Sequence, residues 1–428
     1  MRVRSFQSGC VTVIDRLDVH IEIDGRAVRA GNAHFIQRRG GGVTTTFIYA
    51  ATYLSDASAR PIDPNLPLVS GQQVVSDRMP GSFQDCAPDR WGRNLILKRH
   101  RAATAGLAGR TATLNDVDFL AGVSDITRQG ALRFTLPDST DFIGTDADVP
   151  KMIALPRLLH AVDQLDTDDE QQAIKALLDA GSGSLGGARP KASVIDPDGR
   201  LLLAKFPRRT DEWDVMAWEH TALDLAERAG IDVPARSLTG FENRHILLLD
   251  RFDRSEGRRI PYASAMTLTD SVDGDSHDYA DIADSIEDVG DNVRADLAQL
   301  FRRAVLNCAI HNTDDHLRNH GFCGARAGWR LSPVFDINPN PDLNEDRVTS
   351  IGAAVSADEE PAGLMILAGE CRMTAAQART TIREVLEATA GWADVATSNG
   401  TKKRELEMFR PMFDERAATL QDVVRRSR

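Results

Sequence analysis

The stretch HNTDDHLRNHGF, residues 311–322, gathers three histidines, two adjacent aspartates and two asparagines into one polar segment. It directly follows residues 293–308, in which apolar side chains recur at the spacing of a buried helix face. Three interpretations suit such a segment: a metal site, a catalytic loop or a solvated turn. The choice among them determines how the rest of the chain is interpreted.

The metal interpretation rests on the histidines. His316 and His320 are four residues apart and would share one face of a helix, as zinc ligands do, with His311 as a third candidate. The segment has no nearby cysteine pair and no HExxH pattern, and its Asn, Asp and Gly residues favour a loop. We therefore expect His311 and His320 to orient the loop through hydrogen bonds.

The catalytic interpretation rests on order and spacing. Phosphoryl transfer needs a loop over the phosphates, a strand Lys that holds them, a carboxylate near the attacking hydroxyl, and an Asn and an Asp that bind Mg²⁺. Asp314 and Asn319 are separated by four residues, as in the catalytic loop of a protein kinase. The ordered set predicts a kinase-type site: glycine-rich residues 181–188, then Lys205, Asp314, Asn319 and Asp336.

The glycine-rich segment GSGSLGGA, residues 181–188, is a weak signal when taken alone. Its backbone amides are unobstructed and suit an anion, but it is neither a Walker A loop nor the opening of a dinucleotide-binding helix. Two strand-like runs follow it, joined by the turn residues Asp196-Pro197-Asp198-Gly199. We predict a glycine-rich loop that leads into a β-hairpin, with Lys205 near the end of the second strand.

The remaining sequence predicts an α+β chain of three parts. Residues 1–150 begin with alternating strand-like runs and form an N-terminal β-rich subdomain that ends in a polar, Pro-rich boundary. Residues 151–252 form the ATP-binding part of an N-terminal lobe, in which a helix closes at Gly230 before the apolar strand HILLLD. Residues 253–428 show helical periodicity and form a helical C-terminal lobe, whose last helix Pro411 interrupts or kinks.

Composition restricts the partners. The net charge of −12 argues against a broad DNA-binding surface, so any contact with DNA is expected to be indirect. Many of the acidic residues lie in residues 270–296. This segment is interpreted either as a solvated face or as a docking surface for a basic partner. The five cysteines lack CxxC spacing, no apolar run approaches the length of a membrane span, and the first residues do not resemble a signal peptide. We expect a cytoplasmic protein with no membrane contact.

Several motifs together resemble the HipA family of bacterial toxin–antitoxin serine/threonine kinases. The resemblance covers nearly the whole chain and implies a two-lobed, protein-kinase-like fold with an added N-terminal β-rich subdomain and an all-helical C-terminal lobe. The motifs that carry it are APDRWGRNLI (87–96), GSLGGARPKA (183–192), LAKFP (203–207), LLLDRFDR (247–254), HNTDDHLRNHGF (311–322) and LSPVFDINPNP (331–341).

The resemblance also implies roles for individual residues. Asp314 is expected to be the catalytic Asp, Asn319 and Asp336 the Mg²⁺ ligands, and Lys205 the phosphate-holding Lys. Autophosphorylation is expected at Ser184, although Ser182 stands two residues earlier and leaves the choice open. The remaining positions expected to bind ATP are Ser184, Leu185, Gly186, Gly187 and Ala188 in the loop and Asp250, Arg251 and Phe252 in the hinge that receives adenine.

One further assignment stays open. Glu219 lies on the helix that follows Lys205 and is a candidate to orient that Lys, but Glu242 competes with it and a surface ion pair is equally compatible. Phosphorylation of the glycine-rich loop would add about −1.5 to −2 charges and is expected to switch the site off.

The function that the resemblance implies is that of a toxin. It would use ATP and Mg²⁺ to phosphorylate a translation component such as an aminoacyl-tRNA synthetase, which would arrest growth and favour persistence. Its partner would be a HipB-like helix-turn-helix antitoxin, through which alone it would meet DNA. A small-molecule kinase and a noncatalytic partner-binding or co-repressor module remain as alternatives.

Overall fold

The computed structural model describes residues 14–38, 42–104, 113–144, 149–165, 170–181 and 189–425. The chain forms two compact units, each made of two segments. The first unit comprises Met1–Arg208 and Asp253–Ala263, and the second comprises Arg209–Phe252 and Ser264–Arg428. The division predicted from the sequence, at residues 150 and 252, stays a prediction.

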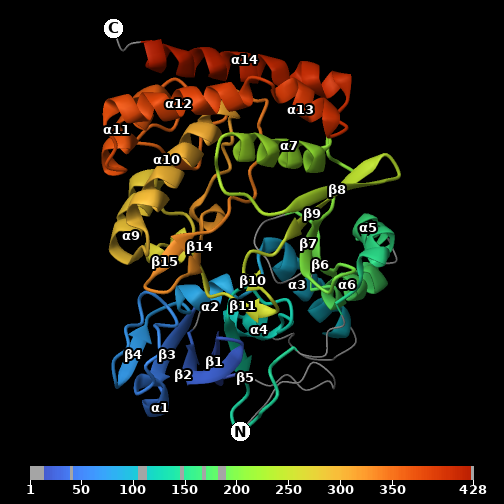
Figure 1. Cartoon of the computed structure of the whole chain (residues 1–428). Helices are drawn as coiled ribbons and strands as arrows, with labels where there is room; N and C mark the ends of the chain where they lie inside the picture. Colours follow the sequence, from blue (N-terminus) through green and yellow to red (C-terminus); the bar gives the residue numbers. More distant parts are fainter. Residues whose placement is uncertain are drawn as a thin grey trace. The chain divides into compact units, whose positions relative to one another are not determined.

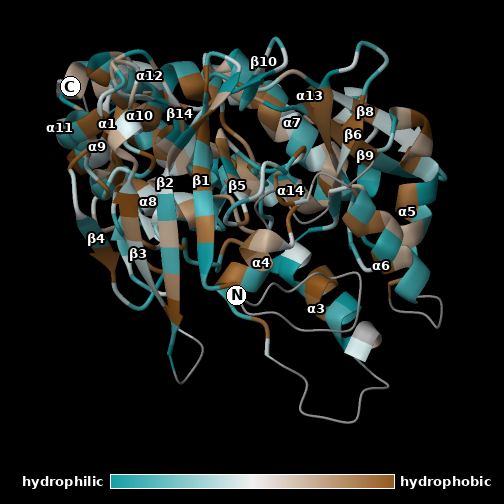
Figure 2. Ribbon diagram, turned by 90° about the horizontal axis from the view of Figure 1, so that it is seen from below, coloured by the Kyte–Doolittle hydropathy of each residue, from teal (hydrophilic) through white to brown (hydrophobic). Residues whose placement is uncertain are grey.

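The first unit is built around an antiparallel five-stranded sheet (Figure 1). Buried and less buried residues alternate along β1, as predicted, and Figure 2 shows hydrophilic and hydrophobic residues along this strand. Asp24 and Gly25 both take positive φ, at 49° and 76°, in the two-residue turn between β1 and β2. In spatial order the strands are β4 (Gln72–Val75), β3 (Val43–Tyr49), β2 (Arg26–Gln37), β1 (Arg16–Ile23) and β5 (Leu132–Thr135).

The core of this sheet is aromatic. Phe47 and Phe83 are fully buried, and the rings of Phe83 and Phe134 meet edge to face with their centroids 5.1 Å apart. Short helices cover the sheet and its connections. They are α1 (Ala51–Leu54), α2 (Gly81–Asp85) and α4 (Asp116–Ala121).

The rest of the first unit contains helices and the predicted hairpin. Leu155, Leu158, Leu159 and Val162 form a buried face of α5. The predicted hairpin is present, and Gly199 takes φ +84° in its turn, where its amide donates to the carbonyl of Asp196. The elements are α3 (Arg90–Thr104), the 3-10 turn η1 (Met152–Ala154), α5 (Leu155–Asp163), α6 (Glu170–Asp179), β6 (Lys191–Ile195) and β7 (Leu201–Lys205).

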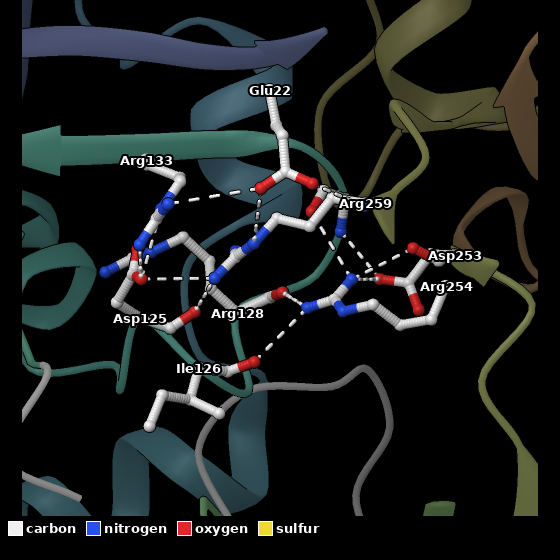
Figure 3. Close-up of polar contacts among 9 residues, drawn as sticks. Glu22, Asp125, Ile126, Arg128, Arg133, Asp253, Arg254 and Arg259 are labelled. Atoms are coloured by element: carbon white, nitrogen blue, oxygen red, sulfur yellow. Dashed lines mark hydrogen bonds and ion pairs between the residues drawn. The ribbon is translucent and has the colours of Figure 1, made fainter. Parts of the chain in front are cut away.

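Residues 253–263 bring a small hairpin back into the first unit, through β10 (Arg254–Ser255) and β11 (Arg258–Arg259). Figure 3 shows how ionic contacts hold it. Arg259 contacts Asp125 at 3.1 Å and Glu22 at 3.6 Å, while Arg254 donates to the carbonyl of Arg128 at 2.7 Å. Asp253 in turn accepts from the amide of Gly130 at 2.7 Å.

The second unit is mainly helical, with short strands among the helices (Figure 1). The predicted helix α7 (Val215–Arg228) begins at the cap Asp214, and Gly230 takes φ +73° just beyond its end. The strand predicted from HILLLD is β9, and it pairs with β8, which was not predicted. The strands of this unit are β8 (Arg236–Phe241), β9 (Arg244–Asp250), β13 (His277–Asp278), β14 (Gly321–Gly324), β15 (Trp329–Leu331) and β16 (Thr349–Ser350), and β12 (Tyr262–Ser264) crosses the boundary between the units.

The helices of the second unit pack through apolar and aromatic faces. Trp218 on α7 stacks on Phe409 with ring centroids 3.8 Å apart. The last helix is not interrupted at Pro411, because Phe409, Met412 and Phe413 are buried around the proline and hold the helix together. After α7, the helices are α8 (Ala265–Leu268), α9 (Tyr279–Val289), α10 (Val293–Ala309), the 3-10 turn η2 (Leu317–Asn319), α11 (Glu360–Glu370), α12 (Ala375–Thr389), α13 (Trp392–Ser398) and α14 (Lys403–Arg425).

A buried ionic triad fixes α11 in this packing. The Glu360 carboxylate accepts from Arg347 at 2.7 Å and from Arg416, and all three side chains are almost fully buried. No helix in the described part of the chain combines the length and the apolar character that a bilayer span requires.

Candidate catalytic site

Residues 311–320 of the polar segment form a loop with one short 3-10 turn, as the composition predicted, and Gly321 and Phe322 begin β14. The loop starts where α10 ends, and His311 takes φ +52° at the point where the chain leaves the helix. The amide of Asn312 donates to the carbonyl of Asn307 at 2.8 Å, and the two side-chain amides meet at 3.2 Å. The buried helix α10 therefore determines where the loop begins.

Asp314 is the exposed residue of this loop, between buried Thr313 and buried Asp315. Its pKa is raised from the ordinary value, first by desolvation and then by the negative charges of Asp336, Asp315 and Glu345, against an opposing effect of His316. A carboxylate with a raised pKa that still reaches solvent is suited to orient a hydroxyl and take up its proton.

Asn319 lies next to Asp314 in space. Its side-chain Nδ2 donates to the carbonyl of Asp314 at 3.0 Å, which leaves the amide oxygen Oδ1 as the group that can face a cation. Asp336 takes φ +57°, an uncommon conformation for a residue with a side chain, and its charge is close enough to raise the pKa of Asp314. One amide oxygen and a carboxylate beside a second carboxylate are hard oxygen donors that fit Mg²⁺.

Asp315 is the buried anchor of the loop. Its carboxylate accepts from the hydroxyl of Tyr279 on α9, accepts from Asn307 Nδ2 at 2.8 Å, and lies 3.1 Å from His320 Nε2. Burial alone would raise the pKa of Asp315, but the His320 ring 3.1 Å away and the hydrogen bond from Tyr279 lower it to about 2. The carboxylate is therefore charged in the native protein and joins the loop to two helices.

The chain after Asp336 also holds the loop. Asn340 Nδ2 donates to the hydroxyl of Thr313 at 3.0 Å, and the amide of Val348 donates to the carbonyl of Thr313 at 3.0 Å. His311 Nε2 lies 2.9 Å from the carbonyl oxygen of Asp342. The loop with Asp314 and the segment with Asp336 are thus one hydrogen-bonded assembly.

Of the predicted hinge residues, Asp250 is the last residue of β9, and Arg251 and Phe252 directly follow the strand. The amide of Asp250 donates to the carbonyl of Ala235 at 2.8 Å. The ring of Phe252 packs on Phe335 with centroids 5.5 Å apart, one residue before Asp336. The hinge and the predicted metal-binding segment are therefore in contact within the second unit.

The zinc interpretation is not supported by the geometry. In the residues that the structure describes, no group of three or more His, Cys, Asp or Glu side chains is arranged to hold a metal ion. His311 and His320 instead lie against the Asp342 carbonyl and the Asp315 carboxylate, which agrees with the loop-orienting role predicted for them.

The first unit holds the predicted phosphate-binding positions. Lys205 ends β7 and is buried, directly across the hairpin from Lys191. Ser182, Ser184, Leu185, Gly186, Gly187 and Ala188 lie outside the described residues, so the roles predicted for them stay predictions. The candidates for a partner of Lys205 also stay untested: Glu219 is buried on α7, and Glu242 lies exposed in the turn between β8 and β9, 3.8 Å from Arg244.

The structure thus brings together Asp314, Asn319 and Asp336, which lie up to 22 residues apart in the sequence, counted from 314 to 336. The sequence did not reveal the contacts of Tyr279 and Asn307 with Asp315, nor an ion pair between Asp89 and Lys191. Asp89 and Lys191 stood in quoted motifs, but no spacing rule connects positions that are 102 residues apart.

Comparison with known proteins agrees with this arrangement. A model of the HipA N-terminal domain matches residues 27–134, and a model of the HipA-like C-terminal domain matches residues 183–393. The fold resembles that of HipA from Shewanella oneidensis, solved with HipB and its operator DNA, with a TM-score of 0.63, 14% identity, and coverage of 96% of this chain and all of that one. The chain therefore has an α+β, kinase-like fold of the HipA type. Since both family models match and together span about three quarters of its length, it belongs to the HipA family.

Two further similarities are more limited. A Haemophilus influenzae protein described as a putative kinase is 26% identical in an alignment 189 residues long, which covers 37% of this chain and 54% of that protein. The match thus spans about half the length of this relative. The Helicobacter pylori proinflammatory kinase CtkA aligns with a TM-score of 0.38 and 14% identity over 55% of this chain and 93% of its own.

Proposed function

We propose that this chain is an ATP- and Mg²⁺-dependent serine/threonine protein kinase that acts as the toxin of a toxin–antitoxin pair. The observation that carries the proposal is the assembly of Asp314, Asn319 and Asp336 on one hydrogen-bonded loop system with the side-chain types and order of a kinase. Membership of the HipA family and the Haemophilus relative described as a putative kinase support it.

In this proposal the residues act mainly by positioning. Asp314 orients the attacking hydroxyl and receives its proton late, because the transition state of phosphoryl transfer is loose. Asn319 Oδ1 and the Asp336 carboxylate hold Mg²⁺, which when bound neutralises charge on the phosphates. Lys205 and the glycine-rich residues 184–188 bind the phosphates, and Asp250, Arg251 and Phe252 receive the adenine.

The partners follow from the same family membership. The Shewanella protein was solved with HipB and operator DNA, and we propose a HipB-like helix-turn-helix antitoxin as the partner through which this acidic chain meets DNA. We propose a translation component such as an aminoacyl-tRNA synthetase as substrate, and Ser184 or Ser182 as the site of autophosphorylation.

The test is phosphate transfer from labelled ATP by the full chain, with and without bacterial lysate. Wild type is expected to label protein in the presence of Mg²⁺ and to arrest growth when expressed without antitoxin. Asp314→Asn should lose both effects by a factor of at least about 1,000 while it still binds ATP. The control Asp284→Asn changes an exposed carboxylate on α9 and should behave as wild type.

Three outcomes would contradict the proposal. Label on a small molecule with none on protein would make the chain a small-molecule kinase. Full toxicity of Asp314→Asn would place the toxicity outside phosphoryl transfer. Antitoxin binding without any labelling in wild type would indicate a noncatalytic binding module.

A further inference from the structure

The motif APDRWGR, residues 87–93, contains a buried carboxylate that the proposed mechanism does not use. Asp89 precedes α3 and caps it, because its Oδ1 accepts from the amide of Gly92 at 2.7 Å. Its other oxygen, Oδ2, accepts from Lys191 Nζ at 2.6 Å. The side chains of Asp89 and Lys191 are only 7% and 2% exposed, so this is a buried ion pair.

The pair joins two distant parts of the first unit. Asp89 lies within the segment matched by the HipA N-terminal domain, and Lys191 opens β6 within the segment matched by the C-terminal domain. Lys191 is also the third residue after the glycine-rich segment 181–188. The contact therefore anchors the strand that leaves the proposed phosphate-binding loop.

Lys191 has a second buried lysine as its neighbour. In the antiparallel pairing of β6 and β7 it lies directly opposite Lys205, and the two side chains are on the same face of the hairpin. Residues paired in this way have Cβ atoms about 5 Å apart, and like charges at that distance repel. Both residues are buried, with 2% and 5% of their surfaces exposed, so water screens this repulsion only weakly.

We propose that Asp89 is a positioning residue for ATP binding, which neutralises Lys191 and so lets Lys205 keep its charge and its place. The inference rests on the proposed function, in which Lys205 holds the ATP phosphates. It gives the N-terminal subdomain a part in nucleotide binding, because the carboxylate comes from the helix start of that subdomain. A buried ion pair is weak evidence for a purely stabilising role, since apolar residues often replace such pairs without loss.

The decisive variant is Asp89→Asn, which keeps a capping oxygen for Gly92 and removes the charge that Lys191 needs. Binding of a nonhydrolysable Mg·ATP analogue to the full chain is measured by calorimetry, and ATP-dependent labelling gives KM and kcat. We expect the Kd and KM to rise by about 10-fold to 100-fold, because a misplacement of about 1 Å can cost the larger factor. The kcat at saturating ATP should change by less than about threefold.

Two readouts separate positioning from mere stability. In Asp89→Asn the two neighbouring buried lysines have one negative charge fewer beside them, which favours the uncharged form of either, so ATP binding should weaken as the pH rises from 7 to about 9, while wild type changes little. Asp89→Glu, which restores the carboxylate, should recover most of the affinity. The matched control is Asp118→Asn, since Asp118 is a buried carboxylate that caps the neighbouring helix α4 through the amide of Asn115.

The double variant Asp89→Asn/Lys191→Gln covers the case in which the single variant does not fold. It removes the positive charge opposite Lys205 together with the carboxylate that pairs with it, so it should fold and bind the analogue within about threefold of wild type. A folded double variant that has lost 10-fold or more in affinity would overturn the proposal. An unchanged ATP affinity of folded Asp89→Asn would also overturn the proposal, and so would an equal loss of ATP affinity in Asp118→Asn. If the wild-type protein binds no ATP, both the proposed function and this inference are wrong.

Discussion

Asp314 is surrounded by charges of both signs, and each should move its titration in a known direction. Burial and the carboxylates of Asp336 and Glu345 raise its pKa, whereas His316 lowers it. The base must be deprotonated to accept a proton, so a raised pKa moves the acidic limb of the activity profile to higher pH. The midpoint of that limb should lie at a pH above about 4, which is the usual pKa of an Asp side chain.

Two neutralising substitutions test this with opposite signs. His316→Gln removes the lowering influence and should shift the acidic limb of kcat to higher pH, by up to about one unit. Glu345→Gln removes a raising influence and should shift it to lower pH. The measurement is single-turnover labelling between pH 4.5 and 8 at saturating ATP, where about one point per half pH unit suffices. Shifts of the same sign in both variants would mean that Asp314 does not control the limb.

Asp315 should make the stability of the protein depend on pH in the acid range. Its pKa is about 2 in the folded protein against an ordinary value of 3.8, so the charged form is stabilised by folding. This contribution, about 2 kcal/mol, is fully present above pH 5 and is lost as the pH falls through 4 towards 2. Asp315→Asn should lower the free energy of unfolding at pH 7 and flatten its decline between pH 5 and 2.

Chemical denaturation over that pH range provides the measurement. The exposed control Asp284→Asn should leave the curve of wild type unchanged. The interpretation would be wrong if Asp315→Asn lost stability equally at pH 7 and at pH 2, because protonation of Asp315 would then have no part in the effect.

At the scale of elements, local signals were sufficient wherever a cap or turn residue stood beside a periodic run. Gly230 follows the end of α7, and Asp196 to Gly199 form the turn between β6 and β7, as predicted, while the cap Asp214 is seen in the structure. The strand β8 was missed because none of its residues, RSLTGF, is buried and only Leu238 and Phe241 among them are large and apolar. Of the two effects predicted for Pro411, interruption of the helix is wrong, because burial of the neighbouring residues outweighs the loss of one helix hydrogen bond, while a kink stays a prediction.

Sequence could predict the candidate site only where its residues share one motif or a known order. Asp314, Asn319 and Asp336 follow the kinase order, but Tyr279 and Asn307 reach Asp315 from helix positions that look like ordinary core. Ion pairs between distant segments have no periodicity at all. Only folding brings Asp89 to Lys191, and so tertiary structure was needed to find that pair.

Two exposed glycines should respond to alanine in opposite directions. Gly199 takes φ +84° with open space around it, so Gly199→Ala forces a side chain into the left-handed region and should cost about 1 kcal/mol. Gly369 lies in α11 without such a φ and also faces open space, so Gly369→Ala should stabilise by about 0.5–1 kcal/mol. Thermal denaturation of both variants measures this, and a gain of stability in Gly199→Ala would contradict the predicted turn strain.

At the scale of the molecule, the first unit is completed by a segment that follows the hinge. Residues 253–263 are separated from Met1–Arg208 by 44 residues that belong to the second unit, 209 to 252. Arg259 attaches the segment to Asp125 and Glu22, and its amide donates to Glu22 Oε1 at 2.7 Å. The predicted adenine-binding hinge is therefore continuous with a hairpin that is anchored in the first unit (Figure 3).

Arg259→Met should consequently disturb the first unit far from the substituted position in the sequence. Removal of Arg259 takes a positive partner away from the buried Asp125 carboxylate, which keeps Arg133 at 2.6 Å, and should cost about 3 kcal/mol. Hydrogen exchange in the full chain should become faster in β1 and residues 122–135, while α10 to α14 keep wild-type protection. Arg258→Met changes the exposed neighbouring residue and should stay within about 0.5 kcal/mol of wild type. Faster exchange confined to residues 253–263 would show that the hairpin does not stabilise the rest of the first unit. Loss of protection in β1 would show that contacts of the hairpin contribute to the free energy of unfolding of that unit.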